Sequence, residues 1–368
     1  MKTGNTSIHH HLVKAKARGL LGQVSYPLWE EDKHQARMAV LYCADTLSEK
    51  LPSLREKYPH NQVQFRHMLH RYQRFVLREL KAAGSAIISA EPFCHLFTAN
   101  MAMALRRDLE AVGFERFVIL LYVRDPADYY LSITNQNLQM SEALPLVKDP
   151  ASFRYNFLEM ADAWEEAFPG ALMVRRYPPE ATGDAVADFN DIAKQTFGIE
   201  LPSVSINSNT SLSAEGMQFL QNYRAAYSSC SRGLITSEAR DLVRMLLRST
   251  ATLRQTRPVL KKEVARQIRD NHKADLDALC LRYGVNFHPD TPPLTPLAPR
   301  DTPYRVSEIV DRVDSQIFEE LGSWVIHEAL RCAQPRRSLS YRLASAVNQQ
   351  LSSRLRSSRL AVALKRVL

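Results

Sequence analysis

A run of seven apolar residues, Phe117 to Val123, constrains the fold more than any other feature of the chain. An unbroken apolar run of this length is typical of a strand that is buried on both faces of a parallel sheet. The run ends at Arg124, and Asp125 and Pro126 then have the form of a helix N-cap followed by proline in the first helical position. The sequence therefore predicts a buried parallel strand with Arg124 at its carboxyl end, where open α/β sheets bind ligands.

Strand-like and helical segments alternate around this run. The strand-like segments are 86–90, 117–123 and 171–176, and helical patterns lie around 61–83, 95–112, 126–140 and 152–168. This alternation predicts an α/β fold with three αβα layers around a central parallel sheet. Residues 182–197 and 213–284 are predicted to be mostly helical, so the fold continues into a helical C-terminal extension.

The beginning of the chain has the composition of a loop that binds phosphate at the start of a helix. The loop residues are Lys2, Thr3, Gly4, Asn5, Thr6 and Ser7, and an apolar-periodic stretch with Ile8, Leu12 and Val13 follows them. Unpaired backbone N–H groups and the helix dipole attract phosphate at a helix N-terminus, and Lys2 adds a mobile positive charge. The ATPase P-loop pattern is not met, because that pattern places a second glycine directly before its lysine. A plain helix cap is the alternative interpretation.

Together with Arg124 and with Ser132 eight positions later, this loop gives the chain a resemblance to the sulfotransferases that use 3′-phosphoadenosine 5′-phosphosulfate (PAPS). The likeness is strongest to the bacterial branch, whose first loop reads K-T-G-T-T-S. Further similarities are Ser89-Ala90-Glu91 at a strand end, Trp164 before the strand at 171–177, and the segment 209–213. The resemblance covers roughly residues 1 to 285 and implies a P-loop fold of the nucleotide-kinase type.

The resemblance also implies how the co-substrate is held. Residues Lys2 to Ser7 would hold the 5′-phosphosulfate of PAPS, Arg124 and Ser132 would hold the 3′-phosphate, and no metal is required. Two departures from the family stand out. Asn5 replaces the usual threonine, and only Met1 precedes Lys2 where the family has a hydrophobic strand. We therefore expect either an N-terminal stretch upstream or a sheet that lacks its central member.

Sulfuryl transfer needs a group that stabilises charge and a base that removes the acceptor's proton. Lys2 is the expected charge stabiliser. His34 and Glu91 are rival candidates for the base, since histidine titrates near neutral pH and Glu91 follows a strand at the ligand-binding edge. Trp164 and Tyr177 are candidates for stacking on adenine, with a place in the core as the alternative. The consecutive residues His9 to His11 project about 100° apart on a helix and do not suit one metal ion.

The function expected from the resemblance is transfer of a sulfuryl group from PAPS to a hydroxyl of a carbohydrate or lipid-linked acceptor. A non-catalytic adenosine-bisphosphate-binding or membrane-associated protein that lost the first strand is the alternative. A nucleotide kinase is disfavoured by the missing second glycine.

The positive charge of the chain gathers in its last residues. The formal net charge is +9, and residues 335–368 hold eight basic residues and no acidic one. Leucine or valine recurs there every four residues from Leu339 to Leu355, which predicts a helix with an apolar stripe and basic flanks. Contact with an anionic membrane surface, packing on the domain or a second subunit, and a disordered tail are the interpretations. Nucleic acid is not expected, because no binding motif accompanies the charge.

The cysteine spacing, the lengths of apolar stretches and the proline-rich segment give the remaining expectations. The five cysteines are scattered without C-x-x-C spacing, which predicts neither disulfides nor a zinc site. No stretch has the form of a signal peptide or membrane span, so a cytoplasmic protein is expected, with the basic tail at the inner face of the membrane under the first interpretation. The expected divisions are an α/β domain at 1–285, a proline-rich linker or strap at 286–304, a helical segment at 305–334 and the basic tail at 335–368.

Overall fold

The computed structural model describes residues 5–29, 35–42, 61–96, 98–140, 147–179, 182–201, 211–227, 236–287 and 302–332. The chain divides into two compact units, and each consists of segments that are distant in sequence. The first unit comprises Met1–Tyr129, Tyr155–Asn209 and His272–Thr291, and the second comprises Tyr130–Arg154, Thr210–Asn271 and Pro292–Leu368. The boundary predicted at residue 285 stays a prediction.

The described residues of the first unit contain four short strands, and all of them pair in parallel. They are β1 (Val24–Ser25), β2 (Ser85–Ala86), β3 (Ile119–Arg124) and β4 (Leu172–Tyr177). β1 pairs with β2, and β3 pairs with β4 over six residues in register from Ile119 opposite Leu172 to Arg124 opposite Tyr177. The prediction of an α/β fold with parallel strands is therefore confirmed. Among the described residues, however, the strands form two separate two-stranded sheets rather than one continuous sheet.

The strand boundaries differ from the sequence prediction by one or two residues in β3 and β4, which begin at Ile119 and Leu172, and by more in β2. Residues 87–90 continue the apolar segment of β2 but are not part of a strand, although the Ile87 N–H still donates to the Ser25 carbonyl at 2.9 Å. Strand β1 was not predicted, because two residues are too short for a periodicity to be recognised. The early end of β2 and the short length of β1 have one cause, since a strand extends only as far as a neighbouring strand pairs with it.

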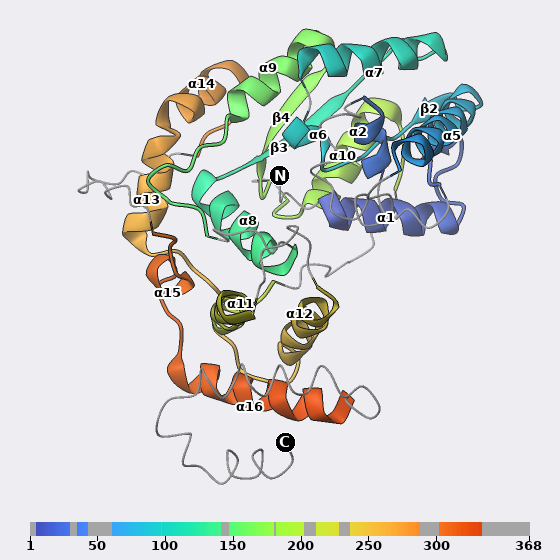
Figure 1. The fold of residues 1–368 in the computed structure, drawn as a ribbon. Helices are drawn as coiled ribbons and strands as arrows, with labels where there is room; N and C mark the ends of the chain where they lie inside the picture. Colours follow the sequence, from blue (N-terminus) through green and yellow to red (C-terminus); the bar gives the residue numbers. More distant parts are fainter. Residues whose placement is uncertain are drawn as a thin grey trace. The chain divides into compact units, whose positions relative to one another are not determined.

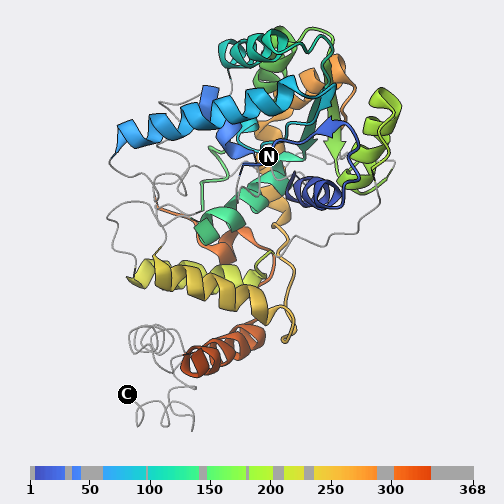
Figure 2. The same cartoon turned by 90° about the vertical axis from the view of Figure 1, so that its right-hand side faces the viewer.

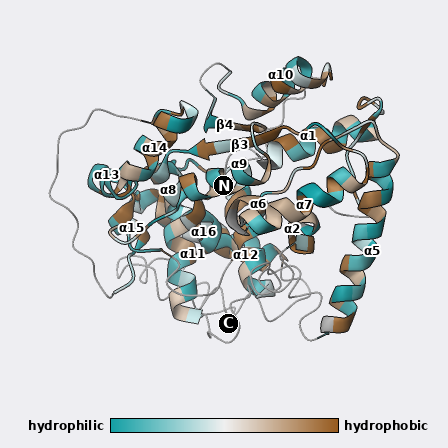
Figure 3. Ribbon diagram, turned by 90° about the horizontal axis from the view of Figure 1, so that it is seen from above, coloured by the Kyte–Doolittle hydropathy of each residue, from teal (hydrophilic) through white to brown (hydrophobic). Residues whose placement is uncertain are grey.

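Helices surround the strands of the first unit (Figure 1). They are α1 (Asn5–Ala17), α2 (Ala36–Tyr42), α5 (Gln62–Lys81), α6 (Phe93–Leu96), α7 (Ala99–Ala111), α9 (Phe157–Ala167), α10 (Ala185–Phe197) and α14 (Lys273–Tyr283). Figure 2 shows α5 along its length and α1 nearly end-on. Helix α5 carries both hydrophilic and hydrophobic residues (Figure 3), as expected for a helix that buries one face.

Strand β3 is covered by helices on both faces. Tyr122 belongs to a buried cluster with residues of α1 and α10, including Leu12 and Val186. On the other face Phe117, just before β3, packs edge-on against Phe168 at the end of α9, with ring centroids 5.2 Å apart. Side chains of a strand alternate between its faces, so residues 117 and 122 point to opposite sides. This arrangement places the apolar run between two helical layers, as its composition predicts.

The second unit is helical among its described residues. Its helices are α11 (Ala214–Tyr227), α12 (Ser237–Ser249), α13 (Lys262–Asn271), α15 (Val306–Ile309) and α16 (Ser315–Cys332), and α8 (Pro126–Met140) passes from the first unit into the second. Helices α11, α12 and α16 pack against one another. None of the helices in the described parts of either unit is long and apolar enough to cross a membrane. The basic tail and residues 288–301 of the proline-rich segment lie outside the described residues.

Candidate functional site

The first described residues already belong to a helix. Helix α1 is described from Asn5 to Ala17, so the second half of the predicted phosphate loop is helical. Thr6 is exposed and Ser7 is half-buried, whereas Ile8 and Leu12 are buried in the core, as the periodicity predicts. Lys2, Thr3 and Gly4 lie outside the described residues, as does the side chain of Asn5. The N–H groups in the first turn of an α-helix have no helical acceptors, and such groups are what binds a phosphate at a helix start.

Arg124 occupies the position that the sequence predicts for it, as the last residue of β3. Its guanidinium carbon lies 5.5 Å from the ring centroid of Tyr177, the last residue of β4 and its neighbour in register. This cation–π contact holds a half-buried positive charge at the carboxyl end of the strand pair. The two candidate ligand-binding residues are therefore together, although one face of the Tyr177 ring is taken by the arginine rather than left open for adenine.

The helix start after Arg124 is confirmed in detail. The Asp125 side chain accepts hydrogen bonds from the N–H groups of Ala127 at 2.9 Å and Asp128 at 3.2 Å. It is thus an N-cap, and Pro126 takes the first position of α8, where a missing N–H costs nothing. Ser132 lies on α8 and is half-buried in the part of that helix that belongs to the second unit.

Glu91 lies in the turn that follows the apolar segment after β2, and it is half-buried. Gln35 connects this edge to the end of β1. Its Nε2 donates to the Pro27 carbonyl at 2.7 Å, and its Oε1 accepts from the Ser89 N–H at 2.6 Å. His34, the rival base candidate, lies outside the described residues, but it directly precedes Gln35 in sequence. The buried amide of Gln35, the residue after His34, is thus hydrogen-bonded to Ser89, two residues before Glu91.

A buried tyrosine, Tyr129, and a half-buried one, Tyr155, lie near Glu91. Burial raises the pKa of both Tyr129 and Tyr155, and the charges of Cys94 and Glu91 raise it further, so both hydroxyls remain protonated. The rings pack edge-to-face with centroids 4.9 Å apart, and the Tyr155 hydroxyl donates to the Cys94 carbonyl at 2.6 Å. Sequence analysis did not find this cluster, because nothing in the local pattern brings residues 91, 129 and 155 together.

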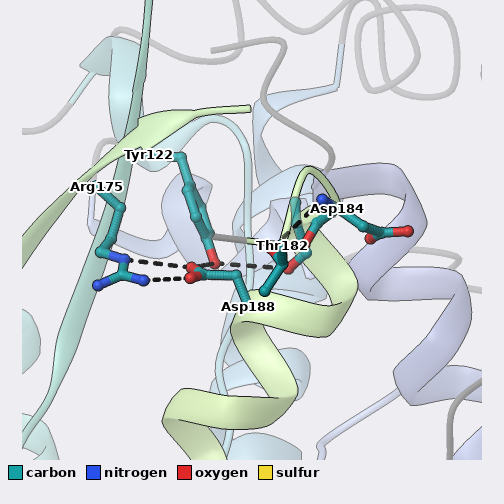
Figure 4. A network of polar contacts seen from close by, with 6 residues as sticks. Tyr122, Arg175, Thr182, Asp184 and Asp188 are labelled. Atoms are coloured by element: carbon teal, nitrogen blue, oxygen red, sulfur yellow. Dashed lines mark hydrogen bonds and ion pairs between the residues drawn. The ribbon is translucent and has the colours of Figure 1, made fainter. Parts of the chain in front are cut away.

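A buried polar network supports β3 and β4 from the side of α10 (Figure 4). The Tyr122 hydroxyl donates to Asp188 Oδ2 at 2.6 Å, and Arg175 forms an ion pair with the same carboxylate. Desolvation and hydrogen bonding to Asp188 raise the pKa of Tyr122, which keeps its hydroxyl a donor. The Asp184 side chain caps the start of α10 by accepting from the Val186 N–H at 2.6 Å. The bonds of Tyr122 and Arg175 to one carboxylate tie β3 and β4 to α10.

The histidines of α1 are part of the core. His9 and His11 are buried, and His9 Nδ1 is hydrogen-bonded to the Tyr26 hydroxyl. Burial lowers the pKa of His11, although Asn190 and Asp184 oppose that shift, and the neutral form is favoured. The described residues contain no cluster of side chains suited to hold a metal ion.

Trp164 lies in the core, the alternative that the sequence analysis gave for it, and the segment 209–213 is described only in part. Trp164 is buried between aromatic rings of the core, with its ring centroid 5.8 Å from that of Phe168 and 5.9 Å from that of Phe93. In the second unit the Ser213 hydroxyl accepts from the Gly216 N–H at 3.0 Å at the start of α11. Ser211 is exposed, and Asn209 and Thr210 lie outside the described residues.

The first unit also contains a cavity of about 540 Å³, which we call the slot. Its lining includes Ile8 from the first turns of α1, the segment from Gly84 to Glu91, and the segment from Gly113 to Tyr122. The cavity is therefore lined both by Ile8 of α1 and by Glu91, one of the two candidates for the base. The chain was also compared with protein-family models, characterised proteins and solved structures, and none of these comparisons returned a match.

Proposed function

We propose that this protein is a PAPS-dependent sulfotransferase with a three-layer αβα fold of the P-loop type. The observation that carries the proposal is the position of Arg124. It stands at the carboxyl end of a parallel strand, its guanidinium is held over Tyr177, and a helix capped by Asp125 follows at once. A cation fixed at this edge suits a phosphate group of a nucleotide, and the resemblance of the sequence assigns it the 3′-phosphate.

The proposed reaction moves a sulfuryl group to a hydroxyl. A bond forms between the acceptor oxygen and sulfur, and the bond between sulfur and the 5′-phosphate oxygen breaks. The products are a sulfate ester and 3′,5′-adenosine bisphosphate, and the acceptor's proton passes to a base. Such a transfer gains its rate mainly from positioning and from stabilisation of charge on the leaving phosphate, by analogy with phosphoryl transfer.

The residues divide these tasks. Lys2 and the first turn of α1 stabilise the 5′-phosphosulfate, while Arg124 and Ser132 hold the 3′-phosphate. Glu91 or His34 accepts the proton. Support for this pairing comes from Gln35, whose hydrogen bonds join the residue after His34 to the strand end that leads to Glu91. The acceptor is a hydroxyl of a carbohydrate or a lipid-linked carbohydrate, on the strength of the resemblance.

Nucleotide affinity tests the role of Arg124. We expect calorimetry to show much tighter binding of 3′,5′-adenosine bisphosphate than of AMP, because only the former carries a 3′-phosphate. Arg124→Ala should lose about tenfold to a hundredfold in affinity for the bisphosphate, since a charge-assisted contact is worth about 1.5–3 kcal/mol. Affinity for AMP should change little.

Arg176→Ala is the matched control. Arg176 lies on β4, is exposed, and has its guanidinium carbon 5.5 Å from the ring centroid of Phe287, so it makes the same type of contact away from the proposed phosphate position. It should keep full affinity. Equal affinity of the unchanged protein for AMP and the bisphosphate, or equal losses in the two variants, would refute the assignment of Arg124.

The separation of the strands into two sheets favours a second candidate, a protein that binds adenosine bisphosphate without turning PAPS over. Both candidates predict nucleotide binding. Formation of a sulfate ester from PAPS, dependent on the charge of Lys2, distinguishes the sulfotransferase from the binding protein.

A further inference from the structure

Helix α5, seen along its length in Figure 2, buries one face and exposes the other. Successive residues of an α-helix are about 100° apart around its axis, so each side chain can be assigned a direction. The basic side chains of α5 fall within an arc of about 140°, centred roughly opposite buried residues such as Met68 and Tyr72. The basic stripe, as we call this set, consists of seven exposed residues, Arg66, His67, His70, Arg71, Arg74, Arg78 and Lys81.

The charge of the basic stripe is not balanced by carboxylates of the described residues. Glu79, the one acidic residue of α5, lies about 140° around the helix from Arg74. Helix α2, which packs against α5, adds Arg37 and no acidic residue. On α7, by contrast, Arg106 pairs with Glu110 at 2.6 Å. None of the ion pairs between described residues includes a cation of α5.

The stability of the helix does not account for the basic stripe. The helix dipole favours cations in the last turn, which suits Arg78 and Lys81 but not Arg66. A cation–π contact places the guanidinium carbon of Arg71 5.7 Å from the ring centroid of Trp29, but this contact uses only one of the basic side chains. A row of cations that begins in the second turn of the helix therefore points to a partner outside the protein.

The shape of the basic stripe discriminates between anionic partners. It lies on the outer surface of one helix and extends about 22 Å from Arg66 to Lys81. Neither the slot nor the cavity beside β4 is lined by residues of α5. A single-stranded nucleic acid is held in a basic groove with open aromatic rings, whereas the ring of Trp29 contacts Arg37 and Arg71. A convex row of cations instead meets a flat anionic surface along its whole length.

We propose that the basic stripe of α5 docks this protein on the surface of a membrane that contains acidic phospholipids. Clusters of about four to eight lysine and arginine residues on one amphipathic helix are typical of such binding. The contact is electrostatic and does not insert the helix, because the apolar side chains of α5 belong to the core and only Val63 among its large apolar residues is exposed. This proposal depends on neither the nucleotide chemistry nor the basic tail.

Sedimentation of the full chain with lipid vesicles tests the proposal. The vesicles consist of phosphatidylcholine with or without phosphatidylserine. In one variant Arg71, Arg74 and Arg78 are all replaced by glutamine, and in a second variant they are all replaced by lysine. Thermal unfolding shows whether each variant keeps its fold. A matched control removes the same charge from exposed positions of α1 and α7 in the same unit, through Lys14→Gln, Arg18→Gln and Arg107→Gln.

The unchanged chain should sediment with vesicles that contain phosphatidylserine and not with phosphatidylcholine alone. The glutamine variant should lose about a hundredfold in affinity, given the usual contribution of each basic residue near an acidic surface. If the basic tail also binds, the two contributions add as free energies and this factor remains. The lysine variant keeps the charge and should keep most of the affinity. The control should change little, because charges outside the contact are screened beyond about 10 Å.

Three results would overturn the proposal. Unchanged affinity of the glutamine variant would mean that α5 does not meet the membrane. Equal losses in the glutamine variant and the control would mean that only net charge matters. Loss of affinity for soluble dextran sulfate without loss for vesicles, or a lysine variant as weak as the glutamine variant, would mean that the basic stripe recognises an acidic chain or a specific guanidinium ligand instead.

Discussion

The two units of the chain treat buried backbone groups differently. In the second unit the carboxylate of Glu215, which is fully buried, accepts from the N–H groups of Thr256 at 3.1 Å and Asp314 at 3.0 Å. One side chain thereby satisfies two loop segments that would otherwise lack acceptors. In the first unit the inner edges of β2 and β3 face the slot, and no described strand pairs with them.

This difference shows two ways in which buried backbone N–H and C=O groups obtain hydrogen-bond partners. A side chain can satisfy a few isolated N–H groups, but a whole strand edge requires another strand. The second unit should therefore be sensitive to the loss of one polar side chain and to any increase in core volume. The first unit should tolerate added volume at the slot.

The largest effect is expected from Glu215→Ala. The change leaves two buried N–H groups without an acceptor, and at about 1–3 kcal/mol for each group the free energy of unfolding should fall by roughly 2–6 kcal/mol. Glu215→Gln keeps one acceptor oxygen and should lose about half as much. Denaturant unfolding, combined with hydrogen exchange in α11 and α16, measures the loss.

Glu320→Ala is the control for this experiment. Glu320 lies on the exposed side of α16, where its Oε1 accepts from Gln316 Nε2 at 3.1 Å. Removing an exposed acceptor should leave the unfolding transition nearly unchanged. If Glu215→Ala is equally harmless, the contrast between the units does not rest on this carboxylate.

A matched pair of alanine substitutions tests the contrast in packing. Ala193 of α10 lines the slot, whereas Ala239 of α12 is fully buried in the second unit. Ala239→Leu should destabilise its unit by about 1–3 kcal/mol through overpacking. Ala193→Leu has room in the slot and should be neutral or stabilising by up to about 1 kcal/mol. Equal destabilisation in both variants, measured by thermal unfolding, would show that the slot is closed in solution.

The smallest expected effect is a difference between the units in how their stability changes as the pH falls. All the buried histidines among the described residues, His9, His11 and His272, belong to the first unit. Burial holds the pKa of His11 below its usual 6.5. As the pH falls below 6.5, the unfolded chain therefore binds a proton that the folded unit does not, and stability decreases until the lowered pKa is reached.

The corresponding measurement is hydrogen exchange in each unit between about pH 7.5 and pH 5, after correction for the intrinsic exchange rate. The first unit should lose protection towards acid, and His11→Leu should weaken that loss. His70→Leu, at an exposed position on α5, should not alter the slope. A slope that persists unchanged in His11→Leu would mean that other groups dominate the acid response.

Local sequence patterns predicted the elements that carry the candidate site. The apolar run at 117–123 became β3, ending at Arg124, and Asp125 caps α8 as its position before proline indicates. Helix α10 ends at Phe197, and its C-cap Gly198 has a positive φ of 66°, which suits a glycine. These features depend on residues that are close in sequence, so they can be predicted from local sequence patterns.

Other parts of the site could not be predicted, because they depend on segments that meet only in the folded protein. The stacking of Arg124 on Tyr177 requires β3 and β4 to pair in one register. The ties that Gln35 makes to Pro27 and Ser89 require the ends of β1 and β2 to be neighbours. Asp188 interrupts an apolar helical face, and only the nearby Tyr122 and Arg175 explain why.

The sequence by itself determined where β3 ends, where α8 begins and which side chains stand at that junction, because caps and apolar periodicity act over a few residues. The tertiary structure alone decided that the four strands form two pairs with a slot between β2 and β3. Strand pairing is a matter of hydrogen bonds between distant segments, and a strand edge does not reveal in its own residues whether a partner is present.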